Sequence, residues 1–177
     1  MNLPNKLTII RMCMVPLMVV CFYIPISGFE RVAAAIFVLA YITDILDGYI
    51  ARRYDLVSDF GKLMDPIADK LLTCAALIMM TGNGMVDPLA TLIIIAREFA
   101  VSGIRLVAAT RKNVIAASKL GKLKTVVQCI AITGILLNIP GLEVVCQVIL
   151  WISVAITVIS FIDYAVSFAR SGKEESK

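Results

Sequence analysis

The chain has 177 residues, of which 60% are hydrophobic, and its formal net charge is +4. Its mean hydropathy of +0.91 is too high for a soluble domain, in which apolar residues make up about half of the chain. The composition therefore excludes a soluble globular protein and indicates an integral membrane protein with one domain. Its positive residues are divided among segments that flank apolar runs, so an anionic membrane surface or substrate explains them better than nucleic acid, which is not predicted as a partner.

Apolar runs of about 20 residues, the length that crosses a bilayer, recur along the chain. We predict an all-α protein with six transmembrane helices, over Leu7–Pro25, Arg31–Arg52, Gly61–Thr81, Pro88–Thr110, Leu123–Ile139 and Val144–Phe168. Turns on one side are marked by Gly28, Gly82-Asn83-Gly84 and Pro140-Gly141. Polar connections on the other side are expected at Tyr54–Phe60 and Arg111–Lys122.

Lysine and arginine are distributed unequally between the two sides of this arrangement. The side of the polar connections carries Lys6, Arg11, Arg52, Arg53, Lys62, Arg105, Arg111, Lys112, Lys119, Lys122, Lys124, Arg170, Lys173 and Lys177. The opposite side carries Arg31, while Lys70 and Arg97 fall within spans. The positive-inside rule therefore predicts that both termini are cytoplasmic.

Four aspartates lie inside or at the ends of apolar segments: Asp44, Asp47, Asp65 and Asp69. A carboxylate buried alone is very costly, so such groups are normally neutralised, paired or bound to a cation. On helices, the first two aspartates share a face and so do the last two. Two such helices can form a cage of oxygen ligands for Mg²⁺ or Mn²⁺. The chain has no histidine, so acid–base chemistry falls to carboxylates, lysine, tyrosine, cysteine or water.

This stretch resembles the signature of the CDP-alcohol phosphatidyltransferase family, D-x2-D-G-x2-A-R, eight residues, and G-x3-D-x3-D. Each fixed letter is matched, by Asp44, Asp47, Gly48, Ala51, Arg52, Gly61, Asp65 and Asp69. The resemblance implies the fold of that family. From the length of the chain and its polar last residues we expect a single membrane-embedded catalytic domain over residues 1–170 and a polar cytoplasmic tail over residues 171–177. The resemblance also implies a homodimer. The positive-inside rule places the four aspartates near the cytoplasmic half of the membrane, so the active site is expected to face the cytoplasm; a bacterial plasma membrane is our working assumption.

The family resemblance assigns roles to the matched residues. Asp44, Asp47, Asp65 and Asp69 would bind divalent metal, with two Mg²⁺ or Mn²⁺ ions expected, and Asp69 would also be the catalytic base. Spacing alone leaves open which aspartate binds metal and which takes a proton. The expected binding site for CDP-diacylglycerol comprises Gly48, Ala51, Arg52, Gly61, Asn5 and Thr8, with Arg11 beside them. The small residues leave room for a nucleotide, and an arginine fork suits diphosphate oxygens.

Basic residues in the second half of the chain point to the other substrate. Arg97 and Arg105 lie eight residues apart, a little over two helical turns, so both fall in one stripe. The segments R-E-F-A-V-S-G-I-R and G-K-L-K-T resemble the branch of the family that transfers the phosphatidyl group to sn-glycerol 3-phosphate. The resemblance implies that Arg97, Arg105, Lys122 and Lys124 hold the glycerol phosphate, and that phosphatidylglycerophosphate and CMP are the products. The alternative for the lysines is that they only set membrane orientation.

Other functions remain open at this stage. The acceptor of another family branch, such as serine, inositol phosphate or phosphatidylglycerol, is the nearest alternative. A cation transporter is a more remote one, because intramembrane carboxylates also line ion paths. The four aspartates lie toward one face of the membrane and none continues a path, which argues against transport.

Two features concern helix packing. Pro66 lies within the predicted third helix, and it either kinks that helix or marks its start. Small residues favour close contact between membrane helices. The candidates for such contacts in a dimer are Ala33, Ala34, Ala35, Ala75 and Ala76.

Overall fold

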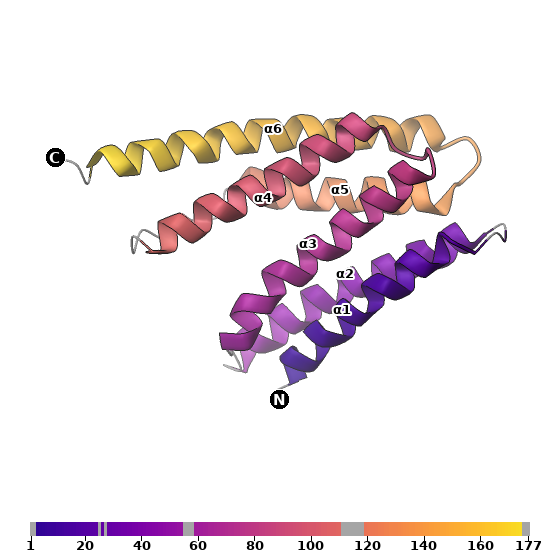
Figure 1. Ribbon diagram of the computed structural model, residues 1–177, viewed down its shortest axis with the longest axis horizontal. Helices are drawn as coiled ribbons and strands as arrows, with labels where there is room; N and C mark the ends of the chain where they lie inside the picture. The colour runs from indigo at the N-terminus through magenta and orange to yellow at the C-terminus, as the bar shows by residue number, and fades with distance from the viewer. Residues whose placement is uncertain (1–2, 25, 27, 55–58, 111–118, 175–177) are drawn as a thin grey trace. The chain divides into compact units, whose positions relative to one another are not determined.

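The computed structural model describes residues 3–24, 26, 28–54, 59–110 and 119–174. These residues form six α-helices, which confirms the all-α prediction (Figure 1). The helices are α1 (Leu3–Cys21), α2 (Phe29–Arg53), α3 (Asp59–Gly82), α4 (Pro88–Thr110), α5 (Lys119–Leu137) and α6 (Glu143–Glu174). Because α6 continues to Glu174, the first residues of the predicted tail are helical.

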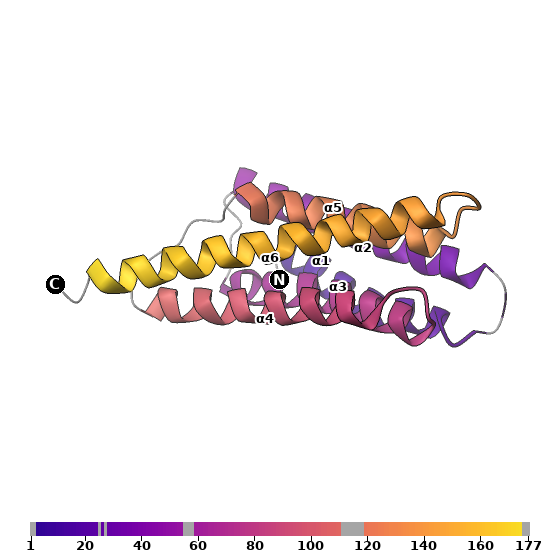
Figure 2. The ribbon, with the colours of Figure 1, turned by 90° about the horizontal axis from the view of Figure 1, so that it is seen from above.

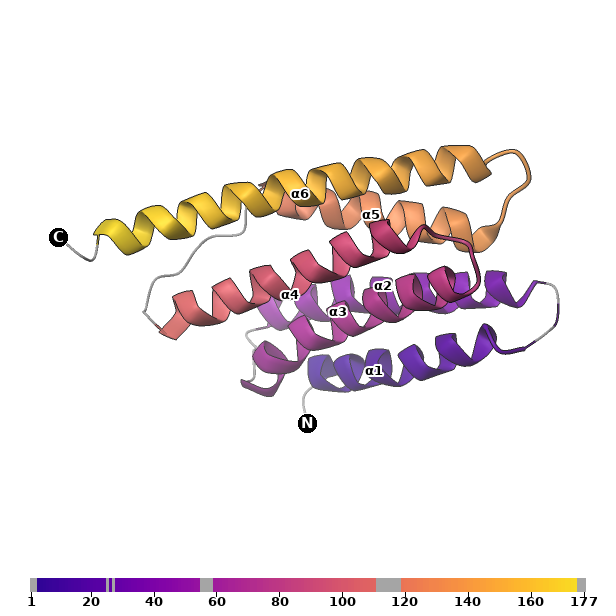
Figure 3. The same cartoon turned by 45° about the horizontal axis from the view of Figure 1, so that its top comes forward.

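The helices are grouped into two compact units. The first comprises Met1–Met85 with Thr133–Pro140, and the second comprises Val86–Ile132 with Gly141–Lys177. In the first unit, α1 packs against both α2 and α3, which also contact each other (Figure 3). In the second unit, α4 packs along α6 (Figure 2). A single catalytic domain over residues 1–170 stays a prediction.

The glycine-marked turns lie where they were predicted. Gly28 precedes α2 with a φ of 101°, and Gly84 lies between α3 and α4 with a φ of 70°. Glycine adopts positive φ at little cost because it has no Cβ. The start of α4 is capped by Asp87, whose Oδ1 accepts a hydrogen bond of 2.7 Å from the Leu89 amide. These local signals therefore fix where the chain reverses.

Besides the C-terminal end of α6, the largest differences from the predicted boundaries lie in α1 and at the start of α5. α1 begins at Leu3 and ends at Cys21, four residues before each predicted boundary. It ends early because the residue before a proline is disfavoured in helical conformation, and Pro25 follows closely. α5 begins at Lys119, so Lys119 and Lys122 are helical and do not belong to the connection. The predicted spans follow the apolar runs, which leave out first turns that contain polar residues. Lysine and leucine are nevertheless good helix formers, so the helices begin before the apolar runs do.

Large apolar side chains are exposed along all six helices. Examples from successive helices are Ile10, Leu17, Leu39, Ile42, Leu71, Ile78, Leu92, Phe99, Val126, Ile130, Val148 and Ile152. A soluble monomer rarely exposes apolar surface this extensively, so these faces are suited to lipid. In the part of the chain that the structure describes, three helices contain segments long and apolar enough to cross a membrane, Phe29–Ile50, Leu120–Leu137 and Glu143–Val166. The chain is a membrane protein, while six spans and cytoplasmic termini stay predictions.

Small residues lie in the core of the first unit. Ala33, Ala34 and Ala76 are fully buried beside larger core residues such as Phe37. These three alanines were expected at a dimer contact, but their burial within the chain removes them from any outer surface. Ala35 is exposed and Ala75 is half-buried. The alanines therefore bring helices of one chain close together, since a small side chain allows a short distance between helix axes.

We expect Ala34→Leu to lower the free energy of unfolding by about 1–3 kcal/mol, because the buried site has no room for three further carbon atoms. Thermal unfolding of the purified protein in detergent micelles measures the change. Ala35→Leu is the matched control, since it adds the same atoms at an exposed neighbouring position. Equal melting temperatures for the two variants would contradict the packing described for α2.

Candidate functional site

The four predicted aspartates belong to two packed helices of the first unit. Asp44 and Asp47 lie one turn apart on α2, and Asp65 and Asp69 lie one turn apart on α3. The Asp47 side chain is 3% exposed, whereas that of Asp44 is 33% exposed. The charges of Asp47, Asp65 and Asp69 all act on the Asp44 carboxylate. The tertiary structure therefore brings the four carboxylates into one electrostatic cluster, called the acidic cluster below.

A polar face of α1 covers this acidic cluster. Asn5, Thr8 and Arg11 are spaced by three residues and are all buried. Arg11 is fully buried, with Nη1 2.5 Å from Asp44 Oδ1 and with Nη2 paired to Asp47 Oδ2. The Thr8 hydroxyl donates a hydrogen bond of 2.7 Å to Asp65 Oδ1. Each of these α1 residues was predicted near the nucleotide cavity, and the structure places two of them directly on the aspartates.

The charge balance of the acidic cluster leaves room for a further cation. One arginine offsets one of four negative charges, and uncompensated charge in a low-dielectric site is strongly unfavourable. The donors are all carboxylate oxygens, which fit a hard divalent cation such as Mg²⁺ or Mn²⁺. Among the described residues, no three acidic or thiol side chains converge on one point. A metal ion bound by Asp44 or Asp47 would share these carboxylates with Arg11, which contacts one oxygen of each.

The remaining residues predicted in the first unit lie close to these aspartates in sequence. Gly48 is half-buried on α2, and Gly61 is buried near the start of α3. Ala51 and Arg52 lie in the last turn of α2, and their side chains fall outside the described part of the structure.

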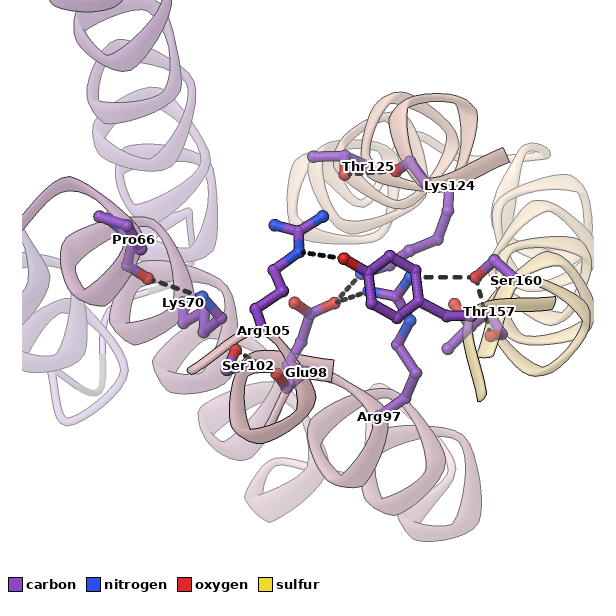
Figure 4. Close-up of polar contacts among 12 residues, drawn as sticks. Pro66, Lys70, Arg97, Glu98, Ser102, Arg105, Lys124, Thr125, Thr157 and Ser160 are labelled. Carbon is purple, nitrogen blue, oxygen red and sulfur yellow. Dashed lines mark hydrogen bonds and ion pairs between the residues drawn. The ribbon is translucent and has the colours of Figure 1, made fainter. Parts of the chain in front are cut away.

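Pro66 lies inside α3, which begins at Asp59. It therefore does not mark the start of the helix, one of the two alternatives left open by the sequence. Proline has no amide hydrogen, so the carbonyl oxygen four residues earlier loses its usual donor. The Lys70 Nζ donates a hydrogen bond of 3.0 Å to the Pro66 carbonyl oxygen, so this lysine turns back along its own helix (Figure 4).

A second polar cluster lies in the second unit, between α4, α5 and α6. It contains three of the four basic residues predicted to hold the acceptor: Arg97, Arg105 and Lys124. The Arg97 Nη2 donates a hydrogen bond of 3.1 Å to Ser160 Oγ (Figure 4). The Arg105 Nε donates one of 3.1 Å to Tyr164 Oη, and its Cζ lies 5.5 Å from the centroid of that ring. We call these residues, together with Glu98, the basic cluster.

Glu98 supplies the negative charge of the basic cluster. Its Oε1 is paired with Lys124 Nζ and lies 3.5 Å from Arg97 Nη1. The side chains of Lys124 and Glu98 are 4% and 13% exposed, so this pair is largely removed from water. Three cations and one anion leave the four charged side chains with a net charge of +2. The arrangement suits an anion that carries two negative charges, such as a phosphate monoester.

Lys122 lies apart from this group. Its side chain is exposed on α5, whereas that of Lys124 is buried. Two residues are about 200° apart around a helix, so the two lysines leave α5 in different directions. The structure therefore brings Arg97, Arg105 and Lys124 together but does not bring Lys122 to them.

Several residues of the two clusters were missed by sequence reasoning. Arg11 was expected to line a cavity but not to pair with Asp44 and Asp47, and Glu98, Ser160 and Tyr164 were given no role. A signal was present for both groups. Asn5, Thr8 and Arg11 recur every three residues, and Ser153, Thr157, Ser160 and Tyr164 recur at intervals of four, three and four. Each set marks one polar face of an apolar helix.

We expect Glu98→Gln to destabilise the protein by about 3–5 kcal/mol, because it leaves the buried Lys124 ammonium without its counter-ion. Glu98→Gln combined with Lys124→Met removes both charges and should recover most of this loss. Thermal unfolding of the three proteins in the same detergent measures the coupling. A double variant no more stable than Glu98→Gln alone would show that the pair does not control stability.

Comparison with known proteins identifies the family of the chain. The sequence profile of the CDP-alcohol phosphatidyltransferase family matches residues 1–159. The chain is similar to the CDP-diacylglycerol–glycerol-3-phosphate 3-phosphatidyltransferase of Rickettsia typhi, with 45% identity over 92% of this chain and 94% of the relative. It is also similar to the proteins of the same name from Bacillus subtilis, at 40% identity over 92% and 93%, and from Haemophilus influenzae, at 34% over 92% and 91%. The chain therefore belongs to the CDP-alcohol phosphatidyltransferase family.

Proposed function

We propose that the protein transfers the phosphatidyl group from CDP-diacylglycerol to sn-glycerol 3-phosphate, giving phosphatidylglycerophosphate and CMP. The observation that carries this proposal is similarity over 92% of the chain to relatives that are named for this reaction. The basic cluster is an independent support, because its net charge of +2 suits the phosphate monoester of this acceptor. Serine, which carries no phosphate group, would leave that charge uncompensated.

Asp69 is the group proposed to remove the proton of the acceptor hydroxyl. As the proton moves to the carboxylate, the hydroxyl oxygen attacks the phosphorus that bears the diacylglycerol. The bond from that phosphorus to the bridging oxygen of the diphosphate breaks, and CMP leaves with the electron pair. A carboxylate is a suitable base because the chain contains no histidine. Asp69 belongs to the acidic cluster with three further carboxylates, and all four are proposed to act on the diphosphate substrate.

Asp44, Asp47, Asp65 and Asp69 are proposed to hold two divalent cations, Mg²⁺ or Mn²⁺. Such ions, when bound, neutralise a diphosphate and stabilise the leaving oxygen. Arg11 is proposed to act at the same site, because its guanidinium is ion-paired with Asp44 and Asp47 and partly compensates their charge. The Thr8 hydroxyl donates a hydrogen bond to Asp65 and so orients this carboxylate of α3. The CDP-diacylglycerol site would comprise these α1 residues with Gly48, Ala51, Arg52 and Gly61.

The membrane arrangement follows from the distribution of charge. We propose six spans with both termini cytoplasmic, in the plasma membrane of a bacterium, since the lysines and arginines cluster in the segments that would share the cytoplasmic side. The active site would then face the cytoplasm, where a water-soluble acceptor is available, while the lipid substrate enters from the bilayer. A homodimer is proposed as well, with contacts on faces other than those of the buried alanines.

Replacement of Asp69 by asparagine should lower the rate of CMP release by about 10²–10⁴-fold, the usual contribution of a general base. Asp87→Asn is the matched control, because it removes the same charge from an exposed aspartate while asparagine keeps the helix cap. CMP release from CDP-diacylglycerol and glycerol 3-phosphate is measured for both purified variants. A wild-type rate for Asp69→Asn would remove the proposed role of this residue.

Removal of divalent cations with a chelator should abolish CMP release, and added Mg²⁺ or Mn²⁺ should restore it, because the acidic cluster needs cations to bind a diphosphate. The same assay compares glycerol 3-phosphate with serine, inositol phosphate and phosphatidylglycerol as acceptors. Release that depends on the metal and on glycerol 3-phosphate is the expected result. Full activity in the chelator would contradict the metal proposal, and preference for another acceptor would contradict the proposed substrate.

A further inference from the structure

A stripe of buried polar side chains runs along one face of α6. Ser153, Thr157, Ser160 and Tyr164 are each at most 5% exposed within an otherwise apolar helix. A buried hydroxyl is unfavourable unless it is hydrogen-bonded. Ser153 Oγ donates to the Leu150 carbonyl oxygen at 2.7 Å, and Ser160 Oγ donates to that of Thr157 at 3.0 Å. Both serines therefore satisfy their protons within the helix.

Only part of this stripe contacts charged groups among the described residues. Ser160 Oγ has a second interaction, because it also accepts from Arg97 Nη2, and Tyr164 Oη accepts from Arg105 Nε. Ser153 donates its hydrogen bond to the backbone and, among the described residues, has no contact with an arginine. The two α6 residues at the basic cluster are thus distinguished by their arginine partners rather than by burial.

The geometry of these two hydrogen bonds draws the arginines together. The Cα atoms of residues eight apart on a helix are separated by about 12 Å, whereas those of residues four apart are separated by about 6 Å. Arg97 and Arg105 therefore converge on acceptors that lie only one turn apart on α6. The charge of Arg105 acts on Arg97, so the two like charges repel each other. An anion bound between them would relieve that repulsion.

The chemistry of the acceptor groups matters as well. A carboxylate would orient an arginine but would also cancel its charge, as Glu98 does for Lys124. A hydroxyl oxygen is neutral, so Ser160 and Tyr164 orient the two guanidinium groups without adding negative charge to that of Glu98, whose Oε1 lies 3.5 Å from Arg97 Nη1. Donor capacity also remains, since the Arg97 Nε is buried and has no hydrogen-bond partner among the described residues.

We propose that Ser160 and Tyr164 are positioning residues, which hold Arg97 and Arg105 in the geometry that binds the phosphate group of the acceptor. This inference rests on the proposed function, because it takes a phosphate-bearing alcohol as the acceptor. It adds α6 to the substrate site as the element that orients the two arginines of α4. Neither residue needs to touch the substrate or the reacting atoms.

Steady-state kinetics of Ser160→Ala and Tyr164→Phe test the proposal, with both substrates varied. Each variant should raise the KM for glycerol 3-phosphate about tenfold or more, as expected for loss of a hydrogen bond to a charged group. The KM for CDP-diacylglycerol should stay within about twofold of the wild-type value. Ser160→Thr retains the hydroxyl and should keep a KM for glycerol 3-phosphate near that of the wild type.

Ser153→Ala is the matched control for a purely structural effect. It removes a buried serine from the same face of the same helix, seven residues earlier, together with the same type of backbone hydrogen bond. Both KM values should be unchanged in this variant. The proposal would be overturned if Ser160→Ala and Tyr164→Phe matched Ser153→Ala, or if they raised the KM of both substrates equally. Melting temperatures show that each variant is folded.

The wild-type protein separates this inference from the proposed function. If it releases no CMP with glycerol 3-phosphate, the proposed function is wrong and the positioning role falls with it. If the wild type is active with glycerol 3-phosphate and the α6 variants keep its KM, only the positioning role is wrong. A binding measurement with glycerol 3-phosphate alone provides a second readout, since the two variants should weaken it and Ser153→Ala should not.

Discussion

The ion pairs of Arg11 with Asp44 and Asp47 are the interaction on which the first unit depends. A helix with exposed apolar faces cannot bring carboxylates to its packed face unless another helix compensates their charge. α1 provides that compensation at Arg11, and it adds a hydrogen bond from Thr8 to Asp65. α1 also packs against both α2 and α3, so the same element contributes to the core and holds the aspartates.

The second unit handles buried charge in a different way. Its arginines are oriented by the neutral hydroxyl groups of Ser160 and Tyr164, while Glu98 and Lys124 form an ion pair. Charge compensation is incomplete in both clusters: the four aspartates with Arg11 carry an excess of negative charge, and the basic cluster carries an excess of positive charge. The two clusters thus have opposite charge preferences, which accords with the proposed substrates, a diphosphate bound with cations and a phosphate-bearing acceptor.

The distribution of polarity is the reverse of that in a soluble protein. Large apolar residues such as Leu92 and Val148 face outward, while Arg11, Lys124 and Asp47 are almost fully buried. In a bilayer the hydrophobic effect does not separate inside from outside, because the surroundings are themselves apolar. Small residues such as Ala34, and the hydrogen-bonded charges, therefore do more to specify which helix faces meet.

The sequence by itself determined the helical membrane class, the glycine turns and the identity of the aspartates and arginines, because length, apolar content and turn chemistry are local properties. Membrane orientation and metal binding stay predictions. Only the tertiary structure decided which charge meets which partner. Arg11 pairs with Asp47 across 36 residues, Lys124 with Glu98 across 26, and Arg97 with Ser160 across 63. These choices depend on how helix faces pack and on the direction in which each side chain leaves its helix, and no local pattern contains either.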